Sequence, residues 1–513
     1  MWRKKSFWGV LLALGTGAAI LAAHGLGAFQ RVEAITYDAR LQWARADAEP
    51  HEDLAVVLID EASLEAMNPL VGRWPWPRSV YADLMEFFRM GGAEAVVFDL
   101  LFTEHQKGSG GELSASDRRL AAATLSTGKV YHAAQVLPRH PEEDAAEGGL
   151  DRPETPARFT LTAAGDWPAD PDNRLLPPYE ALFHASRGIG VVALSADPDG
   201  VFRRARPVFT AGDRILPALS LAPLIADEEP PRVERRDDSL RMGDRVLPLT
   251  GDGRVLVNQV GGFEPYSASG LFAALQQIRR GEVEDLPVYP DEFAGKTVFI
   301  GASAAGLEDL KATGLSSRTP GVLIHASLAS NYLSDDFLAP VPYWLTAVLV
   351  LAMAGATVTL VVGAGRTWLQ TLGPLALAAA YAGWAVWRFE AGVVYALTPP
   401  VGAVVLSWLS ASALLAVTEG REKRRVRRMF SQYVSPEVLN ELTGRPGDVL
   451  HAEVGRQEHL TVLFSDIRGF TSISESLSAA EVVDLLNIYL SEMSDVIMGA
   501  RGTLDKYVGD AVM

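Results

Sequence analysis

The sequence predicts a multidomain membrane protein: a large mixed α/β domain lies between one transmembrane helix and three others, and a second, small α/β domain follows. Three observations support this prediction. Long apolar stretches account for the high hydrophobic fraction of 48% and the mean hydropathy of +0.11. Between the first and second stretches, short apolar runs alternate with helical patterns, as in α/β domains. After the last stretch, strand and helix patterns appear once more.

The first apolar stretch comprises residues 7–29 and follows a short basic segment, residues 1–6. The stretch is longer than the core of about 7–15 residues found in signal peptides, so we expect an uncleaved membrane anchor. A cleavable signal peptide is the alternative. The basic residues Arg3, Lys4 and Lys5 favour a cytoplasmic N-terminus.

Three more apolar stretches lie close together, at residues 341–362, 368–387 and 393–417. Each has about the 20 residues that a helix needs to cross a bilayer. A buried helix of a soluble protein is the alternative for any one stretch, but three in a row with short loops argue against it. Pro399 and Pro400 are expected to delay or kink the last helix.

Four crossings bring the chain back to the side on which it began, and positive charge gathers on that side. Basic residues lie at the N-terminus, at Arg366 between the second and third spans, and in Glu419–Arg428, which contains six basic residues and two acidic ones. Such an excess is typical of cytoplasmic segments. We therefore expect a multi-pass protein of the cell (inner) membrane, in contact with the lipid bilayer, with residues 30–340 outside the cytoplasm.

The block of residues 30–340 has a globular composition, and its strand-then-helix order predicts a mixed α/β domain. Residues 103–175 are rich in Gly, Ser, Pro and acidic residues, and are expected to form a surface excursion with partial disorder. The expected strands include Leu54–Ile59, Ala95–Phe98, Gly190–Leu194, Val255–Val260 and Lys296–Ile300, and the expected helices include Val80–Met90 and Leu271–Arg279.

Asp60 and Asp99 each follow an expected strand of this block. Open α/β sheets bind ligands at the carboxyl ends of their strands, so each residue is a candidate ligand contact. Capping a helix or bracing a loop is the more common role of such an aspartate. His325 lies in an apolar context and is expected to be a core histidine rather than a ligand.

The overall composition excludes some classes of partner and linkage. The net charge of −17 argues against nucleic acid as a partner. The chain has no cysteine, so neither disulfides nor cysteine-bound metals hold any part of it together.

The C-terminal segment carries the most specific pattern of the chain. Residues Leu460–Phe464 are apolar and predict a buried strand that ends at Asp466. Helical spacing over Ala479–Ile497 predicts a connecting helix, and a Gly509-Asp510 turn predicts a hairpin. Singly, Asp466 is a common helix cap and Asp510 a common turn residue.

Together, the two aspartates suit a different chemistry. The strand–helix–hairpin order brings both carboxylates to one edge of a sheet, where they repel each other unless a cation lies between them. Paired aspartates beside phosphate-binding backbone are what phosphoryl transfer with two Mg²⁺ (or Mn²⁺) ions per site requires.

The run Leu463–Thr471, followed by Lys506–Asp510, closely resembles the class III nucleotide cyclases. The resemblance implies a ferredoxin-like α/β domain that converts ATP to cyclic AMP and pyrophosphate as a homodimer. It further implies that Asp466 and Asp510 hold the metal ions with the backbone of Ile467, and that Lys506 contacts adenine. The residues implied to line the triphosphate site are Ile467, Gly469, Phe470 and Thr471.

Cyclase domains of this family continue beyond the metal-binding hairpin, whereas this sequence ends at Met513. Residues 457–513 are therefore expected to be an incomplete cyclase domain, and the fragment alone is expected to be inactive. A receptor that has lost catalysis is one alternative. A guanylate cyclase is another, which Lys506 disfavours because that class usually carries Glu there.

Four motifs of the outer block resemble the second type of CHASE domain, an extracellular sensor of bacterial receptors. The resemblance implies a sensor over residues 30–340 for an unidentified extracellular ligand. Residues 418–456 are expected to form a helical connector that passes a change in helix packing to the output domain. The motifs are Arg73–Arg78, Asp199–Arg204, Gly295–Gly306 and Thr319–Ala326.

Overall fold

The chain forms two compact units, and each is described by itself. The computed structural model describes residues 2–106, 113–138, 156–165, 167, 169–225, 231–304, 307, 309–430 and 459–513. One unit comprises Ala13–Leu360 and Gly365–Ser407, and the other includes the described part of Trp408–Met513. The connector predicted at residues 418–456 lies mostly outside the described residues.

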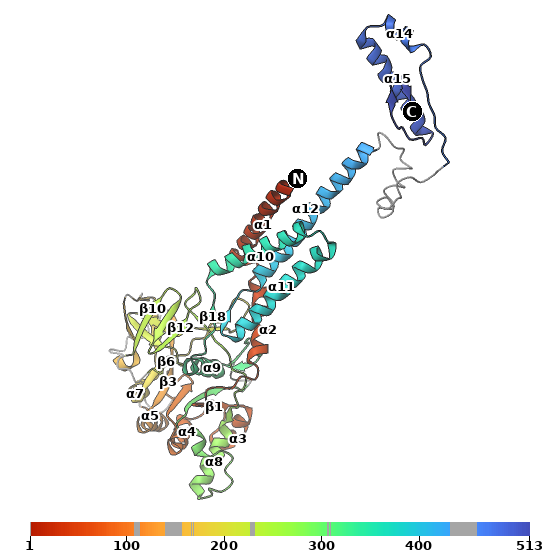
Figure 1. Cartoon of the computed structure of the whole chain (residues 1–513). Helices are drawn as coiled ribbons and strands as arrows, with labels where there is room; N and C mark the ends of the chain where they lie inside the picture. The colour runs from red at the N-terminus through yellow and green to blue at the C-terminus, as the bar shows by residue number, and fades with distance from the viewer. Residues whose placement is uncertain are drawn as a thin grey trace. The chain divides into compact units, whose positions relative to one another are not determined.

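A mostly parallel sheet forms the centre of the domain within residues 30–340, the sheet domain (Figure 1). Its strands follow the order β14-β1-β15-β2-β3, with β6 beside β3 and the short β5 antiparallel to the end of β3. The central strands are continuous apolar runs, as expected for a parallel sheet that is covered on both faces. The bounds are β1 Leu54–Ile59, β2 Ala95–Asp99, β3 Val130–Pro138, β5 Asn173–Leu176, β6 Gly188–Val191, β14 Tyr266–Ser267 and β15 Thr297–Ala302.

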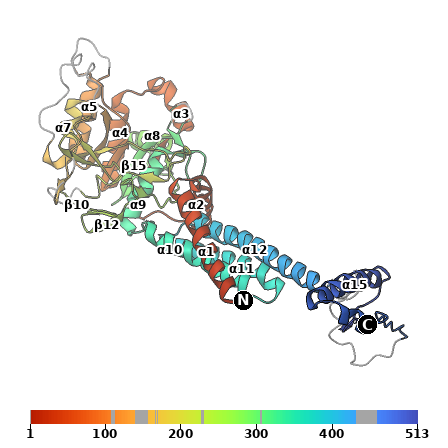
Figure 2. The ribbon, with the colours of Figure 1, turned by 90° about the horizontal axis from the view of Figure 1, so that it is seen from above.

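Helices cover the two faces of this sheet, because alternate strand residues point to opposite sides. On one face, residues such as Val57 and Phe98 pack with helices α3, α4, α5 and α8. On the other face, Val56 and Val97 pack with α9 (Figures 1 and 2). The bounds are α3 Glu61–Val71, α4 Arg78–Gly91, α5 Ala115–Thr127, α8 Ala268–Arg280 and α9 Gly321–Ser334.

A second hydrophobic cluster lies under the smaller sheet β12-β11-β10-β4 and packs against α9 through Ile324 and Leu328. The strands are β4 Thr162–Ala163, β10 Arg232–Arg236, β11 Ser239–Met242 and β12 Arg245–Pro248. The predicted strand at Val255–Val260 is realised only as β13, Val255–Leu256, and Gly190–Leu194 is shifted to β6.

The prediction of a surface excursion over residues 103–175 is wrong for its middle part. This stretch contributes α5 and the strand β3, whose first five residues are buried. Polar residues on both sides concealed the strand, although Val130–Ala134 is itself apolar apart from His132. His132 stacks on Phe98 at a centroid distance of 5.2 Å inside the core.

The close approach of α4 to the loop before β15 gives a sharp stability prediction. A Cβ atom at Gly91 would lie 1.9 Å from the carbonyl oxygen of Pro290. Because backbone must move to relieve this overlap, we expect Gly91→Ala to lower the free energy of unfolding by about 2 kcal/mol or more. Thermal denaturation of the purified protein measures it. Gly251→Ala, where nothing lies within 4 Å, is the control, and equal effects would contradict the prediction.

Within the residues that the structure describes, three helices are long and apolar enough to cross a membrane: Phe7–Gly25 within α1, Tyr343–Gly363, which is α10, and Thr398–Thr418 within α12. The fourth predicted span, 368–387, lies in helix α11 (Thr367–Glu390), which contains Gln370 and Pro374 and is not one of the three. Helix α1 comprises Trp2–Gly25 and α12 comprises Thr398–Phe430.

The span predicted at 393–417 begins later than expected. Val393–Val394 form strand β19, which pairs with β18 (Ala339–Pro340), and α12 starts at Thr398. Pro399 and Pro400 occupy the first turn, where proline costs no backbone hydrogen bond. The expected delay by these prolines is confirmed.

The C-terminal segment forms two helices and a hairpin. Helix α14 comprises Phe470–Ser476, α15 comprises Ala479–Gly499, and β20 (Tyr507–Val508) pairs with β21 (Ala511–Val512). Ser478 and Glu481 form a capping box that starts α15. The helix and the hairpin agree with prediction. The buried strand over Leu460–Phe464 does not form: these residues are exposed, and in this part of the described chain only Ser465 bridges to Val512.

Candidate functional site

The structure brings Asp466 and Asp510 together, although 43 residues separate them in the sequence. Ser465 and Val512 exchange two backbone hydrogen bonds of 3.0 and 2.8 Å. Asp466 follows Ser465, and Asp510 lies in the two-residue turn between β20 and β21. The turn starts at Gly509, whose φ of 65° suits such a hairpin. Two short pieces of backbone therefore position the carboxylates.

The two carboxylates influence each other's ionisation. A side-chain hydrogen bond with Asp510, and then the like charge of Asp510, raise the pKa of Asp466. The backbone N–H of Ile467 donates to Oδ2 of Asp510 at 3.4 Å, which holds that carboxylate in place. A pair of this kind is destabilised when both members are ionised, so a bound cation would stabilise it.

The backbone after Asp466 turns directly into α14. Gly469 has a φ of 77°, which favours glycine, and it precedes the first helical residue, Phe470. The N–H of Phe470 donates to the carbonyl of Ile467 at 3.1 Å, so the Phe470 N–H already has a hydrogen-bond partner. Ile467 thus lies beside the acidic pair, whereas Phe470 and Thr471 form the start of the helix.

Lys506 is not brought to the acidic pair by a contact within the described residues. Its Nζ atom lies 3.3 Å from the carboxylate of Asp505, and both side chains are exposed.

Sequence reasoning missed two hydroxyl contacts that hold this site against α15. Tyr489 Oη lies 3.0 Å from Ser465 Oγ, and Tyr507 Oη lies 2.8 Å from Ser494 Oγ. The helical spacing placed Tyr489 on the apolar face of α15, but nothing in the sequence paired it with Ser465.

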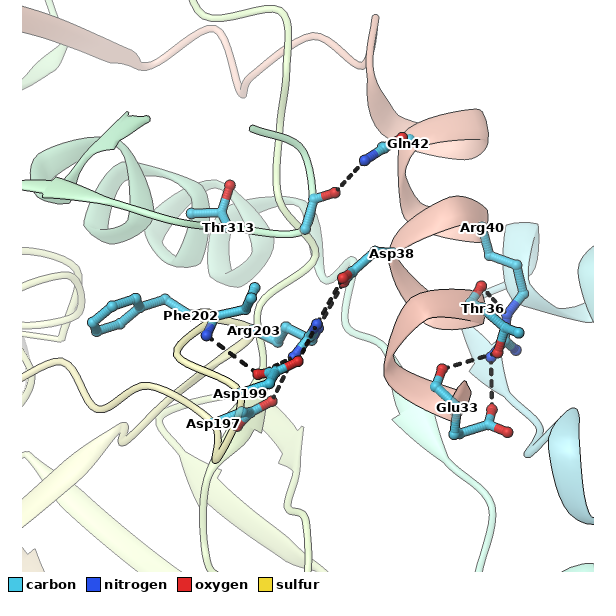
Figure 3. A network of polar contacts seen from close by, with 12 residues as sticks. Glu33, Thr36, Asp38, Arg40, Gln42, Asp197, Asp199, Phe202, Arg203 and Thr313 are labelled. Atoms are coloured by element: carbon cyan, nitrogen blue, oxygen red, sulfur yellow. Dashed lines mark hydrogen bonds and ion pairs between the residues drawn. The ribbon is translucent and has the colours of Figure 1, made fainter. Parts of the chain in front are cut away.

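A second group of polar residues joins the sheet domain to α2 (Gln30–Arg45), the helix that follows α1 (Figure 3). The guanidinium of Arg203 is 5% exposed and donates to both carboxylate oxygens of Asp38 on α2, each at 2.6 Å. It also donates to both oxygens of Asp199 at 2.9 Å. Hydrogen bonding to Arg203 holds the pKa of Asp199 below its ordinary value. Asp197 lies 3.4 Å away.

The other side of α2 contacts the start of α12. The carboxylate of Glu33 accepts hydrogen bonds from the N–H groups of Leu397 and Thr398, at 2.7–3.0 Å. Arg40 donates to Glu33 at 2.9 Å (Figure 3). It also donates to the carbonyl of Tyr395 at 2.9 Å. A carboxylate at a helix N-terminus is favourable because the helix dipole is positive there. Helix α2 therefore links the sheet domain to the beginning of the last membrane-capable helix.

The structure combines an α/β domain, helices that are long and apolar enough to cross a membrane, and a C-terminal segment in which two carboxylates are paired. Comparison with known families is consistent with both parts. The CHASE2 domain family matches residues 13–363, and the chain belongs to that family. The adenylate and guanylate cyclase catalytic domain matches residues 452–513.

Curated relatives match over limited stretches. An adenylate cyclase of Anabaena cylindrica is 33% identical over 122 residues, which is 23% of this chain and 24% of that protein. The terminal-differentiation-specific adenylate cyclase of Dictyostelium discoideum is 44% identical over 54 residues, covering 10% and 2%. Human retinal guanylyl cyclase 1 is 39% identical over 94 residues, covering 18% and 8%. The chain thus spans about a quarter or less of these relatives, and no solved structure matches it significantly.

Proposed function

We propose that the protein is a membrane receptor adenylate cyclase, which converts ATP to cyclic AMP and pyrophosphate under the control of its CHASE2 domain. The observation that carries this proposal is the pairing of Asp466 with Asp510 next to the Ile467 backbone. Similarity to two adenylate cyclases supports the substrate.

The acidic pair has the donor chemistry that magnesium or manganese prefers. Mg²⁺ commonly binds through one or two carboxylates and completes its coordination with water and substrate phosphates. When bound, two such ions would favour ionisation of the ribose 3′-hydroxyl and neutralise the triphosphate. Asp466 and Asp510 would hold them together with the Ile467 carbonyl, and the backbone at Gly469–Thr471 would lie along the triphosphate.

Lys506 is suited to contact the adenine of a nucleotide that is bound at the acidic pair of a second subunit. In a head-to-tail homodimer, Asp466 and Asp510 of one subunit would face Lys506 of the other. The exposure of the Lys506 side chain supports this arrangement.

Four crossings, with the CHASE2 domain outside the cytoplasm, are part of the proposal. The pairing of β18 with β19 supports α11 as the return crossing, because it joins the segment before α10 to the segment after α11. The link from Arg203 through α2 to the start of α12 supports control of the output segment by the sheet domain.

The choice of nucleotide is tested with the full-length protein in membranes. We expect the protein to form cyclic AMP from Mg-ATP and little cyclic GMP from Mg-GTP. We expect Lys506→Glu to lower cyclic AMP formation about tenfold or more, because it removes a contact with adenine worth about 1.5–3 kcal/mol. Both products are quantified chromatographically.

The matched control is Arg501→Glu, the same charge reversal at an exposed residue of the same segment. Cyclic GMP as the main product would favour the guanylate cyclase alternative, which the similarity to a retinal guanylyl cyclase keeps open. Neither product, at normal expression and folding, would favour a receptor without catalysis.

A further inference from the structure

A cavity of about 750 Å³ opens at the carboxyl edge of the parallel sheet in the CHASE2 domain. Asp99 at the end of β2, Gln135 in β3, Val192 after β6 and Ala302 at the end of β15 all line it. Open α/β sheets bind ligands at this edge, and small-molecule sites commonly measure 300–1,000 Å³. The position and the volume therefore suit a small molecule.

Two carboxylates and one ammonium group face this cavity. Burial raises the pKa of Asp99 to about 7, against the influence of Lys311. Burial and then the charge of Asp99 raise the pKa of Asp309 to about 6. Lys311 Nζ lies 3.6 Å from Asp309, so the cavity has one carboxylate more than it has cations. Acidic groups are in excess.

His325 lines the same cavity with an unused polar atom. Its side chain is 3% exposed, and Nδ1 lies 2.8 Å from Ser220 Oγ. Nε2 is buried and makes no hydrogen bond of normal geometry within the described part of the chain, although the Val192 backbone lies close enough to the ring to raise its pKa slightly against the effect of burial. Burial lowers the pKa of His325 to about 4, so the ring is neutral, and either tautomer leaves Nε2 as a donor or an acceptor for a ligand.

The remaining wall of the cavity is mostly apolar, with Trp74 as its aromatic member. An aromatic face attracts organic cations as well as apolar groups. A hydrated metal ion would leave such a lining without a partner, so the lining favours an organic cation. The apolar lining residues include Leu100, Leu101, Val136, Leu137, Leu194 and Leu307.

We propose that this cavity is the ligand site of the CHASE2 domain and that it takes a small organic ammonium compound with an apolar or aromatic body. Asp99 and Asp309 face the ammonium group, Trp74 and the leucines hold the body, and His325 offers one further hydrogen bond.

The segment Leu310–Gly314, which includes Lys311 of the cavity wall, contacts α2. Lys311 Nζ lies 5.8 Å from the centre of the Phe202 ring, and the Phe202 N–H donates to the carbonyl of Ala312 at 2.8 Å. Gln42 on α2 donates to the carbonyl of Gly314 at 3.0 Å, and Arg203, next to Phe202, binds Asp38 on α2 (Figure 3). A ligand that moves Lys311 therefore acts on α2, a consequence that rests on the proposed receptor function.

The binding test uses the purified full chain in nanodiscs without nucleotide, with 2-phenylethylamine as the probe. Its controls are 2-phenylethanol, which is neutral, and 3-phenylpropionate, which is anionic. We expect calorimetric titration to show the amine binding at least about tenfold more tightly than either control, since a charge-assisted hydrogen bond contributes that much. Binding of the alcohol or the acid as tight as that of the amine, or no binding of the amine at millimolar concentration, would overturn the proposal.

Two variants locate the site by effects of opposite sign. Asp99→Asn is expected to weaken amine binding at least about tenfold, and Lys311→Met, which removes the competing cation, is expected to tighten it. Asp60→Asn is the matched control: Asp60 follows strand β1, which β15 separates from β2, and it caps α3 through the N–H of Ser63, outside the cavity.

If Asp99→Asn fails to fold, the Lys311→Met result decides. Unchanged affinity in a folded Asp99→Asn or Lys311→Met protein, or an equal loss in Asp60→Asn, would refute the assignment. Because binding is measured without nucleotide, a failure of the cyclase proposal does not affect this result. Likewise, a cavity that binds no amine does not affect the cyclase assay.

Discussion

Replacing Asp510 with alanine is expected to lower cyclic AMP formation by the full-length protein about 100-fold or more, with Asp466→Ala giving a similar loss. Each change removes one of the two carboxylates that the hairpin and Ser465 bring together. The measurement is the initial rate of cyclic AMP formation in isolated membranes at saturating ATP and Mg²⁺. A double variant is expected to lose no more than either single variant, because the two groups act as one site.

Asp484→Ala is the control for this experiment, since it removes an exposed carboxylate from α15 in the same segment. Its rate should stay close to that of the unaltered protein. An Asp510→Ala protein that keeps most of its activity would show that the pair does not hold the catalytic metal ions.

Replacing Arg203 with methionine is expected to lower the free energy of unfolding of the sheet domain by about 3 kcal/mol, because it leaves the partly buried Asp38 and Asp199 without their shared cation. Asp38, Asp197 and Asp199 all surround this guanidinium, which is 5% exposed. Arg203→Lys should give an intermediate loss, since an ammonium group does not form the paired hydrogen bonds that Arg203 makes with Asp38. Thermal denaturation in detergent should show a decrease of roughly 6 °C or more for Arg203→Met.

The control is Arg236→Met on β10, which removes an exposed arginine paired with Glu234. Exposed ion pairs contribute little, so this change should be close to neutral. A comparable effect of the two substitutions would mean that the Arg203 cluster is no more important than a surface pair.

Much of the fold could be predicted from the sequence because it depends on local patterns. The apolar runs at Leu54–Ile59 and Ala95–Phe98 identified two central strands, and the spacing in Val80–Met90 identified α4. Strand β3 was missed because polar, Gly-rich and Pro-rich residues surround it and dominated the composition of that stretch. Strand formation depends on partners far along the chain, which a local pattern does not contain.

The acidic pair was predicted because each of its members has a local sequence signature, and the buried ion cluster was missed because its members have none. Asp466 and Asp510 each carry a local signature, a strand end and a Gly-Asp turn, whereas the link between Arg203 and Asp38 joins positions 165 residues apart. Asp60 and Asp99 looked alike in sequence, each at the end of a strand. The structure separates them: Asp60 caps a helix, and Asp99 faces the cavity.

The capping of α12 by Glu33 has a practical consequence for engineering. The first backbone N–H groups of the last membrane-capable helix donate to the carboxylate of a residue that is more than 360 positions earlier in the chain. Consider a chimera in which the CHASE2 domain is exchanged and the junction lies between α2 and the membrane-capable helices. Such a chimera would leave those N–H groups without their carboxylate. Grafts that transplant residues 30–45 together with residues 395–398 should retain the coupling, and grafts that divide them should lose it.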